Sequence, residues 1–177
     1  MVSEISNIET IIKMILKVDP KTIIDIGSGF GKYGILVREA ILSDRTLKGE
    51  LSPKNDIIID CVENCSYFYN LPFHQAIYDH HFHEDIRKLE LGNYDLALMI
   101  DIIEHFEKEE AKELLKKMKK TMKNILVCTP KKVVFYKEHF YGSEGSLHHS
   151  QFFPEDFYEA FPEAIDCSTE KSYIFLL

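Results

Sequence analysis

A strand-like segment that runs into a glycine-rich loop and then into a helical segment constrains the fold of this chain most strongly. The sequence TIIDIGSGFGKYG covers residues 22–34, and a helix-compatible stretch continues to about Ser43. Glycine lets a backbone turn sharply and approach a ligand closely, while the N–H groups at a helix start attract polar or anionic groups. The segment therefore predicts a strand–loop–helix unit with a binding site at its loop.

Strand-like and helix-like patterns alternate along the chain. Apolar residues at helical spacing predict an N-terminal helix over residues 1–19. The other expected elements are strands at 57–63, shortly before 83–85, at 94–100 and at 124–129, weak helical structure at 66–77, helices at 108–122 and after Pro154, a polar loop at 44–56 and a β-hairpin at 164–177. This alternation predicts an α/β three-layer sandwich, with a Rossmann-like, seven-stranded, mostly parallel sheet and an antiparallel last strand.

Size and charge narrow the functional classes. The 177 residues suit a single domain over 1–177, and the formal net charge of −8 argues against nonspecific binding to nucleic acid or anionic lipid. The basic run KELLKKMKKTMK, residues 112–123, is interpreted as the solvent face of an amphipathic helix. The N-terminus resembles neither a signal peptide nor a membrane span, and the scattered cysteines 61, 65, 128 and 167 favour reduced thiols, so a cytoplasmic location is expected.

Three types of nucleotide-binding loop are candidates for GSGFGKYG. The phosphate-binding loop needs four residues between its glycines and a Ser or Thr after the lysine, whereas only three residues separate Gly27 from Gly31 and Tyr33 follows Lys32. The dinucleotide pattern G-x-G-x-x-G occurs at Gly29, Gly31 and Gly34, but out of register with the strand end. The third pattern adds an acidic residue inside the strand, Asp25.

In this third pattern the chain resembles the class I S-adenosylmethionine-dependent methyltransferases. The similarity extends over residues 20–177: Glu63 follows the second strand, HEDIRKL carries Asp85, YDLALMIDIIEHF matches the fourth-strand motif, and the terminal hairpin matches the family's inserted seventh strand. The interval from Asp25 to Glu63 is longer than usual because of the polar segment 44–56. The resemblance implies S-adenosylmethionine as cofactor.

The resemblance also assigns residues to that cofactor. Glu63 would accept hydrogen bonds from the ribose hydroxyls, since one carboxylate can accept from two neighbouring hydroxyls. Asp85 would lie near the adenine amino group, with Ile86 beside the ring. The expected cofactor-binding residues are Asp25, Gly27, Ser28, Gly29, Gly31, Glu63, Asn64, Asp85, Ile86 and Asp101.

Chemistry on the acceptor side is expected just after the fourth strand. Asp101, Glu104 and His105 would share one side of a helical turn, and His105 or His148 could act as a general base; equally, Glu104 and His105 could simply cap the next helix. An acid-x-x-Glu-His run with a later His also resembles the metal site of small-RNA 3′-terminal 2′-O-methyltransferases and ubiquinone-pathway O-methyltransferases. A secondary hypothesis is therefore a divalent metal held by Asp101, Glu104, His105 and His148, although those groups usually have Glu at the first position.

The remaining aromatic and histidine-rich segments have weaker interpretations. Residues 131–153 are predicted to form a substrate loop lined by Tyr136, His139, Phe140, Tyr141 and His148 and hinged at Gly142 and Gly145, or else an ordinary surface loop. His74, His80, His81 and His83 lack an acid–cysteine framework for zinc and are predicted to lie at the solvent edge of a short strand.

The function expected from these observations is S-adenosylmethionine-dependent methyl transfer to a small-molecule acceptor. Nucleic acid and membrane partners are not expected. The alternatives are an RNA methyltransferase, a non-catalytic S-adenosylmethionine- or nucleotide-binding domain, and a nucleotide- or dinucleotide-dependent protein.

Overall fold

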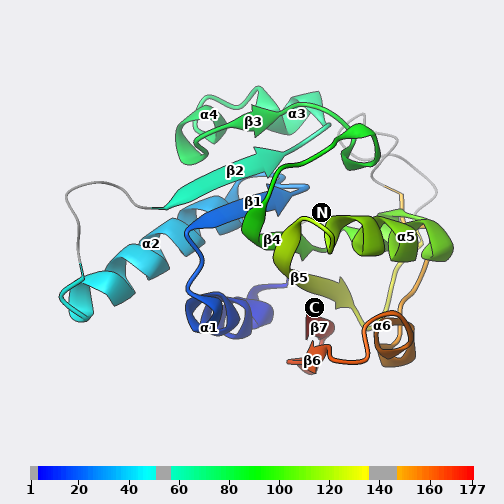
Figure 1. Ribbon diagram of the computed structural model, residues 1–177. Helices are drawn as coiled ribbons and strands as arrows, with labels where there is room; N and C mark the ends of the chain where they lie inside the picture. Colours follow the sequence, from blue (N-terminus) through cyan, green and yellow to red (C-terminus); the bar gives the residue numbers. More distant parts are fainter. Residues whose placement is uncertain (1–3, 51–56, 136–146) are drawn as a thin grey trace.

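The fold is organised around one seven-stranded sheet (Figure 1). The computed structural model describes residues 4–50, 57–135 and 147–177. The strands are β1 (Thr22–Ile26), β2 (Ile58–Val62), β3 (His81–Phe82), β4 (Tyr94–Ile100), β5 (Met122–Pro130), β6 (Ile165–Asp166) and β7 (Ser172–Leu176), in the spatial order β3-β2-β1-β4-β5-β7-β6. β1 to β5 pair in parallel, and β7 runs antiparallel to both β5 and β6. The predicted mostly parallel sheet with an antiparallel last strand is confirmed.

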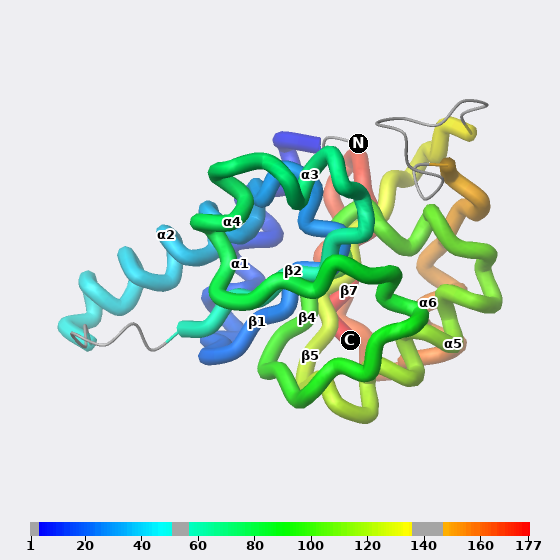
Figure 2. The backbone as a smooth tube through the Cα atoms, turned by 90° about the horizontal axis from the view of Figure 1, so that it is seen from above, coloured from blue at the N-terminus to red at the C-terminus, as the bar shows by residue number. Residues whose placement is uncertain are grey.

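Helices cover both faces of this sheet (Figures 1 and 2). They are α1 (Ile8–Val18), α2 (Lys32–Leu47), α3 (Ser66–Tyr69), α4 (His74–Ile77), α5 (Lys108–Met118) and α6 (Pro154–Ala160). Ile23 and Leu98 pack with the apolar sides of α1 and α2, whereas their strand neighbours Ile24 and Ala97 pack with α5 and α6. Because alternate residues of a strand point to opposite faces, the continuous apolar strands of the sequence supply two cores at once.

Several element boundaries differ from the sequence prediction. The N-terminal helix expected over residues 1–19 is α1 at Ile8–Val18, because a 3₁₀ turn precedes it and Asp19 ends it in the left-handed conformation. α2 continues beyond Ser43 to Leu47, and its polar last turn carries an i,i+4 ion pair between Asp44 and Lys48 at 2.6 Å. α5 ends at Met118 rather than at residue 122, because Met122 already belongs to β5 and is buried in the core. β5 includes Pro130, which a strand tolerates at its end, where the missing N–H interrupts no further ladder bond.

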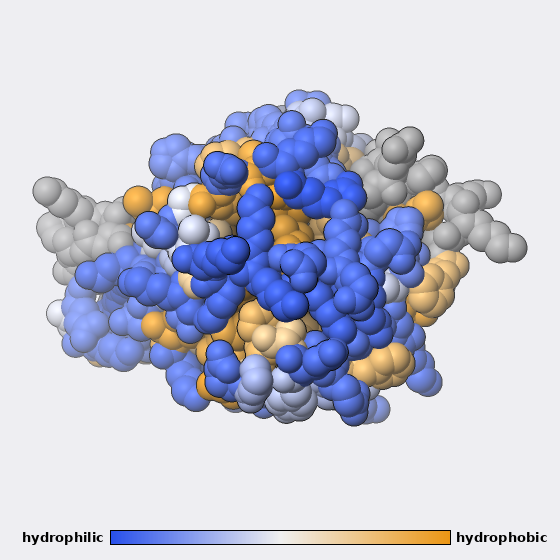
Figure 3. All heavy atoms as spheres, turned by 45° about the vertical axis from the view of Figure 1, so that its right-hand side comes forward, coloured by the Kyte–Doolittle hydropathy of each residue, from blue (hydrophilic) through white to orange (hydrophobic). Residues whose placement is uncertain are grey.

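The lysine-rich helix α5 is amphipathic as predicted. Its buried side consists of Ala111, Leu114, Leu115 and Met118, while Lys116 and Lys117 are exposed. The face of the molecule in Figure 3 is largely hydrophilic, with apolar surface visible between the hydrophilic side chains. In the described ranges, no helix combines the length and the hydrophobicity that a membrane span requires.

A buried asparagine joins the first described turn to the C-terminal hairpin. Asn7 is fully buried at the end of a 3₁₀ turn, Ile5–Asn7. Its Nδ2 donates to the Ser172 hydroxyl at 2.8 Å and lies 3.6 Å from Cys128 Sγ, and its Oδ1 accepts from the Thr169 hydroxyl at 2.7 Å. Since a buried amide without partners is costly, these bonds fix α1 against the β5–β7 side of the sheet.

Candidate functional site

The glycine loop at the end of β1 has the backbone that only glycine adopts readily. Gly27 and Gly29 have φ angles of +67° and +53°. A Cβ at Gly27 would lie 1.9 Å from Ile102 Cδ1, whereas a Cβ at Gly29 would meet nothing nearer than the Gly27 carbonyl oxygen at 4.0 Å. Gly27 is therefore required for packing as well, but Gly29 faces open space, as expected where a ligand approaches the backbone.

Asp25 lies directly below this loop with its carboxyl group buried. Its Oδ2 accepts a hydrogen bond of 2.6 Å from the Tyr78 hydroxyl, which follows α4. Burial raises the pKa of Asp25 to about 7, the bond from Tyr78 opposes this rise, and the nearby Glu63 charge adds to it. In this structure Asp25 therefore joins β1 to the segment after α4 and positions the loop from beneath.

Glu63, one residue past β2, holds the loop from the other side. Its Oε2 accepts from the Gly29 N–H and its Oε1 from the Cys65 N–H, both at 2.8 Å. Burial raises the pKa of Glu63, and these two N–H bonds oppose the shift. Because each carboxylate oxygen has two acceptor sites, Glu63 keeps capacity for hydroxyl donors beside Gly29.

The third predicted acid, Asp85, forms an ion pair with Arg87. Asp85 accepts from the Arg87 N–H at 2.9 Å, which caps the 3₁₀ turn Ile86–Lys88, and its two oxygens pair with the Arg87 guanidinium. The Arg87 side chain lowers the pKa of Asp85. Ile86 is buried against the core and Asn64 is exposed. Arg87 thus fixes the carboxylate that the family pattern associates with adenine.

Asp101 marks a strained backbone position at the end of β4. Its φ of +55° is unusual for a residue other than glycine, and its N–H donates to the Cys128 carbonyl at 2.8 Å. Backbone strain of this kind concentrates at functional sites. Asp101 directly follows β4, and the side chain of the next residue, Ile102, packs against Gly27 of the glycine loop.

Three side chains after β4 and before α6 form what we term the glutamate–histidine group: Glu104, His105 and His148. One ligand atom from each lies within 4.8 Å of the others, and the two imidazole centroids are 4.8 Å apart. Asp101 is not part of this group, so one of the four predicted metal ligands is not brought together with the rest. The other three predicted residues do converge.

Glu104 is fully buried, and among the described residues only one of its two carboxyl oxygens has a hydrogen-bond partner. Its Oε2 accepts from the Thr129 hydroxyl at 3.1 Å, while its Oε1 has no hydrogen-bond partner in the part of the chain that the structure describes. Burial, with the charge of Asp101, raises the pKa of Glu104 to about 8. A buried carboxyl oxygen without a partner indicates a site that a proton or a cation would complete.

Both histidines of the group have their tautomer set by the backbone. His105 Nδ1 lies 2.9 Å from the Leu147 carbonyl and His148 Nδ1 lies 2.6 Å from the Val134 carbonyl. Since a carbonyl only accepts, each Nδ1 carries the proton and each Nε2 carries the lone pair. Burial lowers the pKa of His105 to about 4 and also lowers that of His148. Both rings are therefore neutral near pH 7.

The segment around residue 148 is fixed to the turn after β4. The Glu104 carbonyl accepts from the His149 N–H at 2.8 Å, and the Ser150 hydroxyl donates to the Phe106 carbonyl at 2.7 Å. These bonds place His148 against His105 across a long interval of sequence. The other predicted lining residues, Tyr136, His139, Phe140 and Tyr141, and the hinge glycines 142 and 145, lie outside the described residues.

The prediction for the second histidine-rich segment is partly wrong. His80 and His83 are exposed, but His74 is fully buried and His81 is half-buried, and both lie near the buried Cys61. His74 is inside because the short helix α4 turns its ring toward the sheet. The available sequence signal was a buried-strand cysteine with a histidine 20 residues later on the next strand.

No protein-family model matches the chain, and no curated protein matches its sequence. Solved structures do. A putative O-methyltransferase from Nostoc punctiforme has a TM-score of 0.64 at 12% identity, covering 97% of this chain and 56% of the other. Magnesium protoporphyrin IX methyltransferase from Synechocystis, with bound S-adenosylmethionine, has a TM-score of 0.61 at 12% identity, covering 97% and 77%. An rRNA methylase from Escherichia coli has 0.57 at 15% identity, covering 97% and 62%.

These likenesses bear on the fold. The chain spans little more than half the length of the first of these structures, and all three match it at low sequence identity. The strand order and the antiparallel β7 agree with that similarity. The chain has the fold of the class I S-adenosylmethionine-dependent methyltransferases.

Proposed function

We propose that the protein binds S-adenosylmethionine at the ends of β1, β2 and β4 and transfers its methyl group to a small-molecule acceptor. The observation that carries this proposal is the cradle of Gly29 and Glu63: open space beside a positive-φ glycine, with a buried carboxylate bonded to its N–H at 2.8 Å. Open α/β sheets bind ligands at this edge, at the switch point between β1 and β4.

The chain's own residues supply binding and orientation. Glu63 would accept from the ribose hydroxyls, Gly29 would allow close backbone approach, and Asp101 would lie near the reacting end of the cofactor. When bound, S-adenosylmethionine supplies an electrophilic methyl group. The enzyme then has to hold the acceptor in line with it, and positioning of this kind accounts for much of the rate of a displacement reaction.

Calorimetry with S-adenosylhomocysteine, NAD and ATP tests the cofactor assignment. We expect S-adenosylhomocysteine to bind and the other two not to. Glu63→Ala should weaken binding by roughly 1–3 kcal/mol through loss of the hydroxyl hydrogen bonds, whereas Glu90→Ala, an exposed acid outside the cradle, should leave it unchanged. Binding of NAD or ATP instead would replace the methyltransferase proposal.

The glutamate–histidine group favours a hydroxyl as the acceptor. His105 Nε2 carries a lone pair in a fixed orientation and could take the hydroxyl proton while the oxygen attacks the methyl group. This group would then lie on the acceptor side of the cofactor, next to the described part of the predicted substrate loop, residues 131–135 and 147–153.

A metal-assisted form of the same reaction is the second candidate, and Glu104 Oε1 supports it. A buried carboxylate oxygen without a partner, close to two imidazoles with fixed tautomers, matches what a divalent cation requires. Glu104, His105 and His148 would hold the ion, which would lower the pKa of a bound hydroxyl.

The metal-assisted form is tested with chelator-treated protein. Addition of Mg²⁺, Mn²⁺ or Zn²⁺ should raise the rate of methyl transfer, and Mg²⁺ or Mn²⁺ should also raise the melting temperature. Glu104→Gln should abolish these responses. Methyl transfer from tritiated cofactor into pools of small molecules and of RNA would identify the acceptor class. Methyl transfer at full rate by the chelator-treated protein, without added metal ion, would support the metal-free form.

A further inference from the structure

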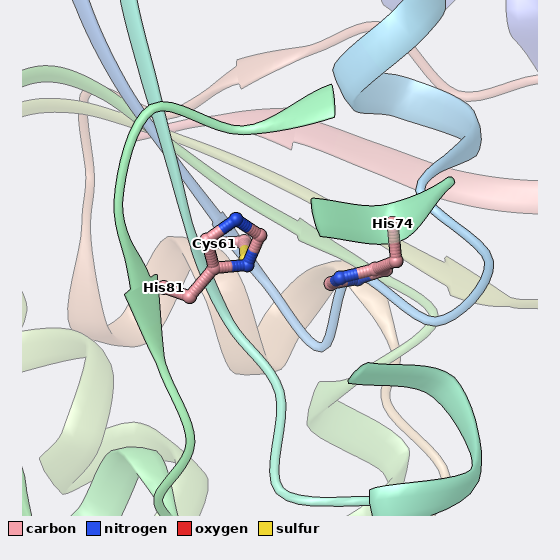
Figure 4. A group of neighbouring side chains, drawn as sticks. All are labelled: Cys61, His74 and His81. Atoms are coloured by element: carbon pink, nitrogen blue, oxygen red, sulfur yellow. The ribbon is translucent and has the colours of Figure 1, made fainter. Parts of the chain in front are cut away.

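A second group of ligand atoms lies under the glycine loop, and we term it the cysteine–histidine group: Cys61, His74 and His81 (Figure 4). One ligand atom from each lies within 4.8 Å of the others, and Cys61 Sγ is 3.3 Å from His81 Nδ1. The three residues come from β2, α4 and β3, and in Figure 4 the His74 ring extends toward the other two side chains.

The parallel pairing of β2 and β3 brings two of these residues together. Cys61 and His81 are register partners, so their side chains leave the same face of adjacent strands. The short helix α4 connects these strands and closes over that face, which places His74 opposite the pair. The arrangement thus depends on backbone elements that are themselves well packed, since Ile77 of α4 belongs to the core on this side.

His74 provides the observation that points to a ligand. Its side chain is fully buried, Nε2 lies 3.0 Å from the Ser28 hydroxyl, and Nδ1 has no hydrogen-bond partner among the described residues. A buried imidazole nitrogen without a partner is unfavourable unless something else completes its environment. The neighbouring side chains of Cys61, His81, Ser28 and Tyr78 do not fill that role, since none of them bonds to His74 Nδ1.

We propose that Cys61, His74 and His81 bind a zinc ion. Thiolate and neutral imidazole are the ligands that zinc prefers, at about 2.3 Å and 2.0–2.1 Å respectively, so two of them at a tetrahedral angle lie about 3.5 Å apart. The Cys61–His81 separation of 3.3 Å already agrees with that value. On binding, the thiol S–H proton passes to solvent and a Zn–S bond forms, and the Ser28 hydroxyl or a water takes the fourth position.

The location of this site indicates a structural role. Ser28 belongs to the glycine loop, and Cys61 is two residues before Glu63, so the ion would connect the loop to β2, β3 and α4. The site is independent of the glutamate–histidine group, which contains no sulfur.

Cobalt substitution tests the proposal with a sulfur-specific signal. Co²⁺ added to chelator-treated protein under reducing conditions should give tetrahedral d–d bands and a thiolate-to-cobalt charge-transfer band in the near ultraviolet, both displaced by one equivalent of Zn²⁺. In Cys61→Ser the charge-transfer band should disappear. In His81→Ala, where the removed side chain is only half-buried, Zn²⁺ affinity should fall by more than about 100-fold, since loss of an outer-shell partner alone costs about 10–100-fold.

Two residues outside the group supply matched controls. His80→Ala removes the adjacent, exposed histidine, and Cys167→Ser removes a half-buried thiol outside the group; both should keep the band and the affinity. Circular dichroism establishes that each variant is folded. Absence of a charge-transfer band in the folded wild type, or its persistence in Cys61→Ser, would overturn the zinc site and leave a hydrogen-bonded core cluster.

Discussion

The glutamate–histidine group and the cysteine–histidine group are similar in geometry but differ in how the chain builds them. Each brings three ligand atoms within 4.8 Å of one another. Glu104 and His105 are adjacent in a single turn, and only His148 arrives from elsewhere, whereas Cys61, His74 and His81 come from three separate elements. The glutamate–histidine group lies past the end of β4, on the proposed acceptor side, and the cysteine–histidine group lies beneath the glycine loop. We therefore propose that similar side chains serve chemistry in one place and architecture in the other.

Removal of the proposed base should have the largest effect. His105→Ala should lower methyl transfer to a hydroxyl acceptor by about 10²- to 10⁴-fold, the usual contribution of a general base, while calorimetry should show unchanged binding of S-adenosylhomocysteine. A parallel loss of cofactor binding would instead assign His105 to the cofactor side. His81→Ala, from the other group, should leave the chemical step intact and change metal affinity and melting temperature.

The buried acid beneath the glycine loop should contribute strongly to the pH dependence of stability, in the same direction as Glu104, whose pKa is also raised by burial. Asp25 is protonated in the folded state up to about pH 7 and ionised in the unfolded chain above about pH 4, so folding takes up a proton between these values and stability falls as the pH rises. Asp25→Asn should remove this loss, gaining roughly 2–4 kcal/mol on the wild type between pH 4 and pH 8. Urea unfolding of both proteins across this range measures it, and parallel curves would contradict the assignment.

A disturbance of the packing between α2 and α4 should have a smaller effect on stability and should mainly affect the cysteine–histidine group. A Cβ at Gly34 would lie 2.5 Å from Ile77 Cγ2 and 2.6 Å from the Tyr78 ring. Gly34→Ala should therefore displace α4 and destabilise the fold by about 1–3 kcal/mol, with weaker Zn²⁺ binding. Gly92→Ala, where a Cβ meets nothing within 4 Å, is the control and should be close to neutral.

The exposed histidines beside each group should give the smallest effects. His80→Ala removes a side chain that is 70% exposed and His149→Ala one that is 43% exposed, and each should change the free energy of unfolding by less than about 0.5 kcal/mol. Metal binding and methyl transfer should be unchanged in both. A large effect of either substitution would show that the ligand groups extend further than we propose.

Most of the fold and the glutamate–histidine group could be predicted from the sequence. Alternating patterns predicted the sheet because each strand is apolar on both faces, and the Asp101–His105 run was visible because its residues are neighbours. His148 was recognisable as a candidate from the family pattern. By contrast, the contact of Cys61 with His81 depends on strand register, and the burial of His74 depends on how α4 closes over the sheet. The spacing of residues along the sequence indicates neither the Cys61–His81 contact nor the burial of His74.

The ends of helices and the partners of individual side chains were also harder to predict from the sequence than the elements themselves. The polar residues after Ser43 looked like a loop, yet they extend α2 because the Asp44–Lys48 pair and the preceding helix favour another turn. Likewise, Asp85 was expected to face adenine, and no sequence pattern indicated that Arg87 would engage both of its oxygens.

The hydrogen bonds of Asn7 have a consequence for how the chain folds. The partners of this buried amide, Thr169 and Ser172, lie 162 and 165 residues later in the sequence. During synthesis the first helix can form early, but its anchoring amide stays unsatisfied until β7 has left the ribosome and paired with β5. The N-terminal turn can thus be secured only after the C-terminal hairpin is available to bond to it.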